Sequence, residues 1–453
     1  MNRLLSIVFV LVISVTLHAQ GVGDSRSAFL RRSNEATKEY HFRMAQERGS
    51  FLRRAWKVSN ESAPVEDPFR RKVDAGQPDH PVVVPVNTPV GEETLSGVGL
   101  VLPFYGSAYR FSMALPAEMT LPSVSEDDVA NAWESLSEGA SHLLEDCLSI
   151  RSRERLGDWA YLQLVDSLSV KVFPFSQNER ELLFGFLLGK SGYKVRFGRN
   201  EGGLTCLYGT EQVIYGRPYF FEDGIHYYRH NEGEGSLSLS NVVSEGDRAL
   251  DLRLADAPAI SGGSVHERRI EVGDINFDYR ISQRLLDFYA SYPHTEMYVK
   301  AGAPVSAPIR ESVYPALQLA IAGLGEVDAT RVILRFVQKL MEHRSDDERW
   351  GFEKWNFPEE SLFYRYGDCD DHAILFARLV RDLVGLEVLL VSCEVDGSPH
   401  ATTAVRFTEP QDGGDWILYG GERYYCCEPS STAAEVGDRR WESFVVKRVD
   451  KID

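Results

Sequence analysis

The stretch that decides the predicted fold is Tyr366-Gly367-Asp368-Cys369-Asp370-Asp371-His372-Ala373. It leads into an apolar-periodic run that stops at Gly385, so a helix is predicted from Asp370 to Val384. Cys369 then lies at the start of that helix, where the helix dipole favours the thiolate over the thiol. We therefore interpret Cys369 as the candidate nucleophile of the chain.

His400 and Glu428 are the candidate partners of Cys369, because both belong to strands predicted after the helix. His400 opens a strand that runs to Phe407, and Glu428 closes the strand after the turn at Gly420-Gly421. Neighbouring antiparallel strands would place the carboxylate beside the imidazole. The imidazole would then exchange protons with the thiol, and the carboxylate would orient the imidazole.

Three segments around these residues resemble the core of transglutaminase-like cysteine domains, and the resemblance covers residues 310–435. They are Phe357-Pro358-Glu359-Glu360-Ser361-Leu362 with the Cys369 stretch, Pro399-His400-Ala401-Thr402-Thr403-Ala404-Val405, and Tyr425-Cys426-Cys427-Glu428-Pro429-Ser430. The whole chain is similar to a group of exported Bacteroidetes-type proteins. The resemblance implies an α+β, papain-like core in which a helix packs on an antiparallel sheet. It also implies cofactor-free acyl transfer on protein or peptide amides through a Cys369-His400-Glu428 triad, either by hydrolysis or by transfer to an amine.

The acidic position departs from the family pattern, which usually has Asp-Pro where this chain has Glu428-Pro429. Glu is one methylene longer, but it serves as the acid in other triads. In addition, Asp368, Asp370 and Asp371 crowd Cys369 and would oppose thiolate formation. A second interpretation is therefore open, in which the domain is a catalytically inactive binding or scaffolding module at the cell envelope.

No metal site is predicted from the acidic residues around Cys369. Adjacent positions on a helix point in different directions, so Asp368, Asp370, Asp371 and His372 are not expected to converge. The stretch around Cys369 also has no paired-Cys or His-x-x-x-His spacing. Its six cysteines are too few for a disulfide framework in 453 residues.

The N-terminus has the pattern of a secretory signal. Arg3 precedes an apolar run from Leu4 to Leu17, and Ala19 is a small residue suited to cleavage, so residues 1–19 are predicted to be removed. We therefore expect export to the periplasm or cell envelope, or secretion. The chain has 49 basic and 67 acidic residues, a net charge of −18, which argues against nucleic-acid binding.

Four regions are predicted after the signal. Residues 20–60 are expected to form a basic helical arm, which would contact an acidic envelope surface or pack on the chain's own acidic domain. Residues 61–90 form a Pro-rich linker. Residues 91–280 would form a middle α+β domain, and residues 281–453 would form the C-terminal transglutaminase-like domain.

The middle domain contains a weak echo of the C-terminal one. Phe175–Phe197 overlays Asp368–Leu390 without gaps, and both segments are predicted to form a helix, a glycine stop and a strand. In this overlay Ser176 falls on Cys369. One interpretation is a degenerate second copy of the same core that lacks the nucleophile. The other is chance similarity, because the order helix, glycine, strand is common.

Overall fold

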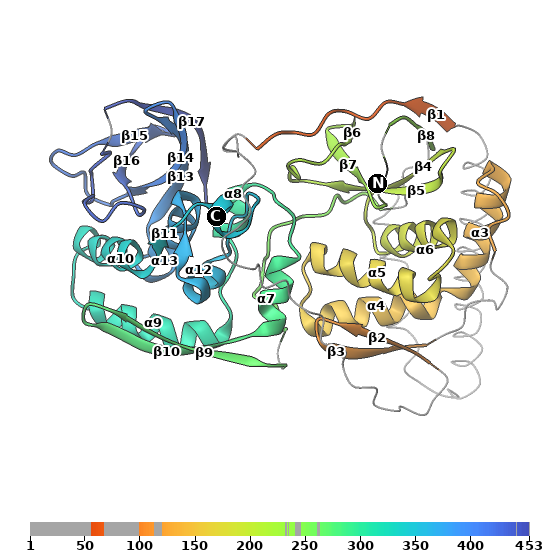
Figure 1. Ribbon diagram of the computed structural model, residues 1–453, viewed down its shortest axis with the longest axis horizontal. Helices are drawn as coiled ribbons and strands as arrows, with labels where there is room; N and C mark the ends of the chain where they lie inside the picture. Colours follow the sequence, from red (N-terminus) through yellow and green to blue (C-terminus); the bar gives the residue numbers. More distant parts are fainter. Residues whose placement is uncertain are drawn as a thin grey trace, which may run out of the picture.

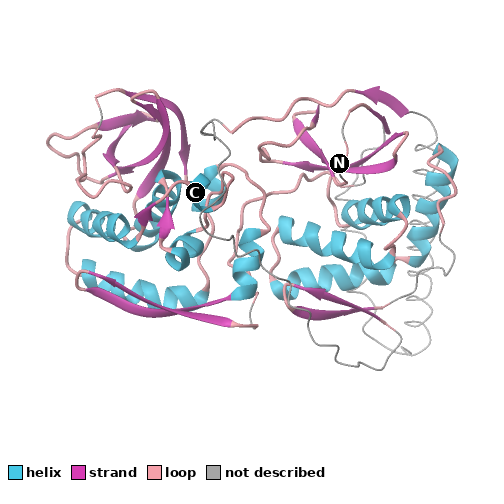
Figure 2. Cartoon of the chain, viewed as in Figure 1, coloured by secondary structure: helices cyan, strands magenta, loops and turns pink. Residues whose placement is uncertain are grey.

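The computed structural model describes residues 56–67, 99–112, 120–231, 233, 235–240, 246–260, 263–440 and 442–452. These residues form two lobes side by side, the middle lobe and the C-terminal lobe (Figure 1). In each lobe, helices lie between a strand hairpin and a larger sheet, as Figure 2 shows. The mixture of helices and antiparallel sheets agrees with the predicted α+β class. Within these residues, no helix is long and apolar enough to cross a membrane.

The elements of each lobe follow in chain order. The middle lobe contains β1 (Trp56–Ser59), β2 (Leu100–Phe104), β3 (Ser107–Phe111), α3 (Glu126–Gly139), α4 (Ser141–Glu154), α5 (Asp158–Val172), α6 (Gln177–Lys190), β4 (Val195–Asn200), β5 (Gly203–Thr210), β6 (Phe220–Glu222), β7 (Ile225–Arg229) and β8 (Leu237–Ser240). The C-terminal lobe contains β9 (Val265–Val272), β10 (Ile275–Ser282), α7 (Gln283–Ala290), α8 (Met297–Ala301), α9 (Ala307–Ile321), α10 (Glu326–Leu340), β11 (Glu342–His343), α11 (Asp346–Arg349), α12 (Pro358–Tyr364), β12 (Tyr366–Gly367), α13 (Cys369–Leu383), β13 (Glu387–Val395), β14 (Ser398–Arg406), β15 (Trp416–Tyr419), β16 (Glu422–Cys427) and β17 (Phe444–Lys451).

The two larger sheets have the same strand order. In the C-terminal lobe the order is β15-β16-β14-β13-β17, and in the middle lobe it is β6-β7-β5-β4-β8, with β1 added beside β8. These strands correspond one to one in chain order, and every neighbouring pair is antiparallel. One sheet arrangement therefore occurs twice along the chain.

The two sheets also have the same strand register. Phe220 pairs with Tyr227 in the middle lobe, and Ile417 pairs with Tyr424 in the C-terminal lobe. The residue numbers differ by the same 197 in both cases, because 417 − 220 and 424 − 227 are equal. The correspondence between the lobes can therefore be followed residue by residue.

With this offset, residues 203–231 overlay residues 400–428 without a gap. The loop before the outer strand contains a glycine at the same place in each lobe. Gly216 has a φ of 71° and its counterpart Gly413 has a φ of 92°. Glycine adopts this left-handed region without the steric cost that other residues incur. The two loops thus share their length and a left-handed glycine at one position.

Each larger sheet also carries a small apolar cluster that is separate from the main core. The middle-lobe cluster contains Leu207, Phe220, Tyr227, Leu237 and Leu239. The C-terminal cluster contains Leu389, Val391, Cys393, Val395, Ala404 and Tyr424. The C-terminal residues and their close packing partners come from five strands. Four of these strands are counterparts of the strands that supply the middle-lobe cluster, so the core is repeated along with the topology.

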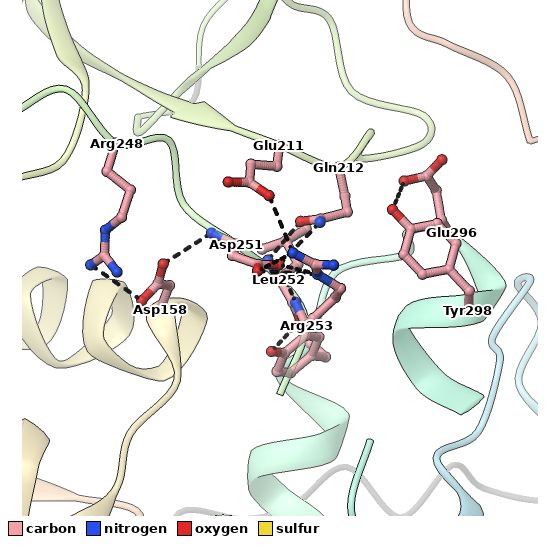
Figure 3. A network of polar contacts seen from close by, with 10 residues as sticks. Asp158, Glu211, Gln212, Arg248, Asp251, Leu252, Arg253, Glu296 and Tyr298 are labelled. Carbon is pink, nitrogen blue, oxygen red and sulfur yellow. Dashed lines mark hydrogen bonds and ion pairs between the residues drawn. The ribbon is translucent and has the colours of Figure 1, made fainter. Parts of the chain in front are cut away.

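The chain between the lobes is held by a polar network, which Figure 3 shows around residues 248–253. Gln212 Nε2 donates to Asp251 Oδ1 at 3.0 Å, and the same side chain accepts from Leu252 N at 2.7 Å. From the C-terminal lobe, the Tyr292 hydroxyl donates to the Leu252 carbonyl at 2.8 Å. This segment is therefore fixed by hydrogen bonds from both lobes.

The predicted basic arm differs from the structure at its end. Trp56–Ser59 forms strand β1, which pairs with β8, whereas the sequence predicted helix as far as Lys57. Backbone pairing with a sheet edge has outweighed local helix propensity here. Residues 20–55 of the predicted arm, the signal at residues 1–19 and linker residues 68–90 lie outside the described residues.

Two further differences concern the interior of the chain. The hairpin of β9 and β10, which the sequence assigned to the middle domain, packs on α9 of the C-terminal lobe. The apolar spacing of Asp127–Leu148 in the sequence predicts one helix, but the structure has two, α3 and α4, which meet at Ala140. The predicted domain boundaries themselves stay predictions.

Candidate active site

The start of α13 positions Cys369. Asp368 caps this helix, because its side chain accepts a hydrogen bond from Asp370 N at 3.3 Å. Cys369 is the first helical residue, only 3% of its surface is exposed, and its Sγ donates to Asp370 Oδ1 at 3.6 Å. The candidate nucleophile thus lies at a helix N-terminus and is buried.

The structure brings His400 and Glu428 together. His400 Nε2 lies 2.9 Å from Glu428 Oε2, between β14 and the end of β16. Glu428 also accepts hydrogen bonds from the backbone N and the hydroxyl of Ser430. Burial raises the pKa of Glu428, but the hydrogen bond and charge of His400 and the two Ser430 bonds outweigh it and leave this pKa below its usual value. Glu428 is therefore ionised at neutral pH.

The helix that carries Cys369 packs on the sheet that carries the other two residues. α13 contacts β13 and β14, the strands at the centre of the C-terminal sheet. His400 lies on β14 and pairs with Cys393 of β13. Of the three predicted site residues, two are in direct hydrogen-bond contact, and the third lies on the helix packed against their sheet.

Buried aspartates surround the start of α13. Burial raises the pKa of Asp370 and Asp371 well above the usual value, and the nearby charge of Asp368 adds to the effect. The same two causes, in the same order, raise the pKa of Asp346. The acidic residues around Cys369 therefore carry less negative charge than the sequence alone implies.

A buried polar network, which sequence reasoning missed, fixes the chain that leads to this helix. Asp371 accepts from Asn356 N at 2.7 Å and from Asn356 Nδ2 at 2.8 Å. Lys354 Nζ then donates to Asn356 Oδ1 at 2.8 Å and to Glu360 Oε1 at 2.7 Å. The only sign of this network in the sequence was the pair of glutamates in Phe357–Leu362. Their spacing alone does not identify the residues with which they form hydrogen bonds. The network ties the start of α12 to the start of α13.

Two groups of side chains within the described residues could hold a metal ion. The ligand atoms of Asp346, Glu353 and Asp368 lie within 4.8 Å of one another, and so do those of Asp368, Cys369 and Asp370. Of the four residues that were not expected to converge, only Asp368 and Asp370 share a group, and Asp368 is an extended cap residue rather than a helical one. Clustered buried carboxylates also share protons, so the grouping by itself does not identify a metal site.

The middle lobe has different residues at the positions that correspond to the predicted site. Ser176, Gly203 and Asn231 stand where the C-terminal lobe has Cys369, His400 and Glu428. A Cβ at Gly203 would lie 2.4 Å from Asn178 Oδ1. The Asn178 side chain therefore fills the space that a histidine at this position would need.

His230 forms a second ion cluster, also missed from the sequence, in which the imidazole and Glu181 are buried and Asp166 is partly exposed. Its Nδ1 lies 2.9 Å from Glu181 Oε1, and its Nε2 lies 2.9 Å from Asp166 Oδ1. Burial lowers the pKa of His230, but the two carboxylates outweigh burial and raise it to about 9. The partners belong to α5 and α6, far from His230 in the sequence. The imidazolium thus holds these helices to the end of β7.

Neither protein-family models nor curated proteins provide a match to this chain. The case for a function therefore rests on the residues of the site and on their geometry.

Proposed function

We propose that the C-terminal lobe is a transglutaminase-like cysteine enzyme that transfers acyl groups from protein or peptide amides. Cys369 is the nucleophile, His400 is the general base and acid, and Glu428 orients the imidazole. The observation that carries the proposal is the 2.9 Å contact between His400 and Glu428, two largely buried groups on neighbouring strands. A histidine held by an ionised carboxylate is the pair that activates a thiol in Cys-His-acid sites.

We also infer that both lobes are copies of one papain-like unit and that the middle copy is degenerate. The shared strand order, the shared register and the repeated apolar clusters support duplication over chance. Ser176 and Gly203 cannot replace a thiol and an imidazole, so the proposed chemistry is confined to the C-terminal copy.

In the proposed reaction, His400 takes the proton of Cys369, and the thiolate attacks the amide carbonyl carbon. The Cys369 backbone N–H donates to the oxyanion. Because Glu428 holds Nε2 of His400, the proton moves through Nδ1. His400 then protonates the leaving amine, and a thioester remains on Cys369. Water or an amine attacks this thioester and releases an acid or a new amide, without a cofactor.

The sequence also underlies the proposed location. The signal at residues 1–19 would direct export to the periplasm or cell envelope, or secretion. The basic residues within 20–60 would offer a contact with an acidic envelope surface. The negative net charge still argues against a nucleic-acid partner.

Selective alkylation of the native mature chain tests the proposal. Burial raises the pKa of Cys393 and of Cys426 to about 12, so neither thiol should react near neutral pH. We expect iodoacetamide to label Cys369 first, Cys369→Ser to abolish this labelling, and Cys393→Ser to leave it unchanged. An unreactive Cys369 beside a labelled Cys393 would contradict the proposal.

An inactive scaffolding module is the second candidate function. The burial of Cys369, with 3% of its surface exposed, favours this alternative, because a substrate needs access to the thiol. Peptide amides incubated with the mature chain distinguish the two candidates. Cys369-dependent hydrolysis or amine transfer supports the enzyme, whereas an inert Cys369 supports the scaffold.

A further inference from the structure

One segment joins the two ends of the middle-lobe sheet. Residues 56–67, here called the closing segment, pair with β8 through β1 and then reach the opposite end of the sheet, beside β6. There Ser62 N donates to the Tyr219 carbonyl at 2.7 Å, and Tyr219 N donates to the Ser62 carbonyl at 3.3 Å. Figure 1 shows the closing segment running over the top of the middle lobe.

A carboxylate anchors the closing segment. Glu61 accepts a hydrogen bond from Arg229 Nε at 2.7 Å, and both side chains are largely buried. Glu61 also accepts from Gly235 N at 3.0 Å. Farther along, the Val65 carbonyl accepts from Gly216 N at 3.0 Å. The closing segment thus combines backbone pairing with the buried Glu61–Arg229 ion pair and with a 2.8 Å contact between Asp67 Oδ2 and His294 Nε2.

The C-terminal sheet has the same strand order, and within the described residues no such segment joins its two ends. β15 and β17 are its outer strands, and no strand in the described part of the chain pairs with their outer sides. Cys426 N donates to the Asp415 carbonyl at 2.9 Å, so the backbone of Asp415 faces β16. In an antiparallel ladder successive residues of an edge strand face alternately toward and away from the neighbouring strand, so the N–H and C=O of Trp416 point away from β16. Trp416 corresponds to Tyr219, the residue that pairs with the closing segment in the middle lobe.

Apolar side chains are exposed along these open edges, the outer sides of β15 and β17. The exposed fraction is 43% for Trp416 and 63% for Leu418 on β15, and 49% for Val445 on β17. Unprotected edge strands with apolar side chains pair readily with another extended chain. The open edges therefore have the character of a docking surface.

A cation at the open edges indicates what the incoming chain carries. Arg439 N donates to Asp415 Oδ2 at 3.1 Å, just before β15, and the Arg439 guanidinium lies 5.6 Å from the Phe444 ring at the start of β17. Arg439 Nε is buried and has no hydrogen-bond partner among the described residues. A carboxylate would satisfy Arg439 as Glu61 satisfies Arg229.

We propose that the open edges bind an extended segment of another protein, which pairs with the outward backbone of β15 and brings an acidic side chain to Arg439. The segment takes the place that the closing segment occupies in the middle lobe. Trp416 pairs with Tyr425 near the end of β16, so the bound segment lies close to Glu428. The inference rests on the repeated sheet and holds whether or not Cys369 is reactive.

Peptide selection on the full mature chain tests this surface. The probe is a displayed library of peptides as long as the closing segment, with Glu fixed where Glu61 stands. We expect binders with alternating apolar residues, and we expect Leu418→Asp and Arg439→Glu each to weaken binding about tenfold or more. Leu319→Asp is the matched control, because Leu319 is 80% exposed on α9, away from the sheet.

Amide hydrogen exchange provides a second readout. Bound peptide should protect the outward amides of Trp416 and Leu418, whereas Ile417 and Tyr419, which face β16, should change little. Three results would overturn the proposal. The first is that no peptide is selected. The second is binding that neither Leu418→Asp nor Arg439→Glu weakens. The third is a chain that is dimeric in solution and that Leu418→Asp makes monomeric, because the occupant of the open edges would then be a second copy of the chain.

Discussion

Replacing Glu428 with Gln removes the charge that holds His400 while preserving the shape of the side chain. The 2.9 Å contact joins His400 to a carboxylate whose pKa lies below its usual value, so the wild-type bond is charge-assisted. The amide of Gln still accepts a hydrogen bond but cannot stabilise the imidazolium. We therefore expect the thiolate–imidazolium form of the site to be lost preferentially.

The size of the effect follows from the strength of such a bond. A hydrogen bond to a charged group contributes about 1.5–3 kcal/mol. One pKa unit corresponds to about 1.4 kcal/mol, so the imidazolium should lose about one to two units of stabilisation. The pKa of the Cys369 thiol should rise by a similar amount, because the proposed stabilisation of the thiolate comes from the imidazolium that Glu428 holds.

The rate of alkylation of Cys369 by iodoacetamide, measured across pH, reports this pKa directly. We expect the inflection to move to higher pH in Glu428→Gln. Glu387→Gln, on β13 of the same sheet, is the control and should leave the profile in place. An unchanged profile in Glu428→Gln would refute the reasoning, since it would mean that His400 does not act on Cys369.

Three other predictions concern stability, measured by urea unfolding. Asn356→Ala keeps the backbone hydrogen bond to buried Asp371 but removes the side-chain bonds to Asp371 and from Lys354, and it should cost about 2–3 kcal/mol. His230→Gln leaves two carboxylates facing each other and should cost about 3 kcal/mol. Because the folded pKa of His230 is raised to about 9, its stabilisation is complete below about 6.5 and is lost as pH rises through 9, and the variant should lack this loss. Gly203→Ala should cost about 1–3 kcal/mol, because its Cβ would meet Asn178 and a φ of 120° is strained for alanine, and Asn178→Ala should relieve only the clash.

Much of the candidate site could be predicted from short-range pattern. The apolar run that stops at Gly385 predicted a helix from Asp370 to Val384, and α13 spans Cys369–Leu383. The alternating residues around His400 predicted a strand, and β14 contains it. The pairing of His400 with Glu428 followed from the rule that consecutive antiparallel strands are usually neighbours.

The second copy could be predicted only in part. The gapless overlay of the α6 and α13 segments was visible, but the later strands share few residue types. Their equivalence rests on pairing register, which is a property of the folded sheet and leaves little trace in composition. The middle-lobe ion cluster around His230 was invisible for the same reason, since its carboxylates come from distant helices.

The sequence by itself determined the local elements around Cys369 and the chemical types of the candidate triad, because caps, apolar periodicity and strand alternation act over a few residues. Tertiary structure decided what those side chains meet. It buried Cys369, tied Asp371 to Asn356, and made a strand of residues 56–59 where helix was predicted. Burial, register and edge pairing depend on residues far apart in the chain, so no local pattern could specify them.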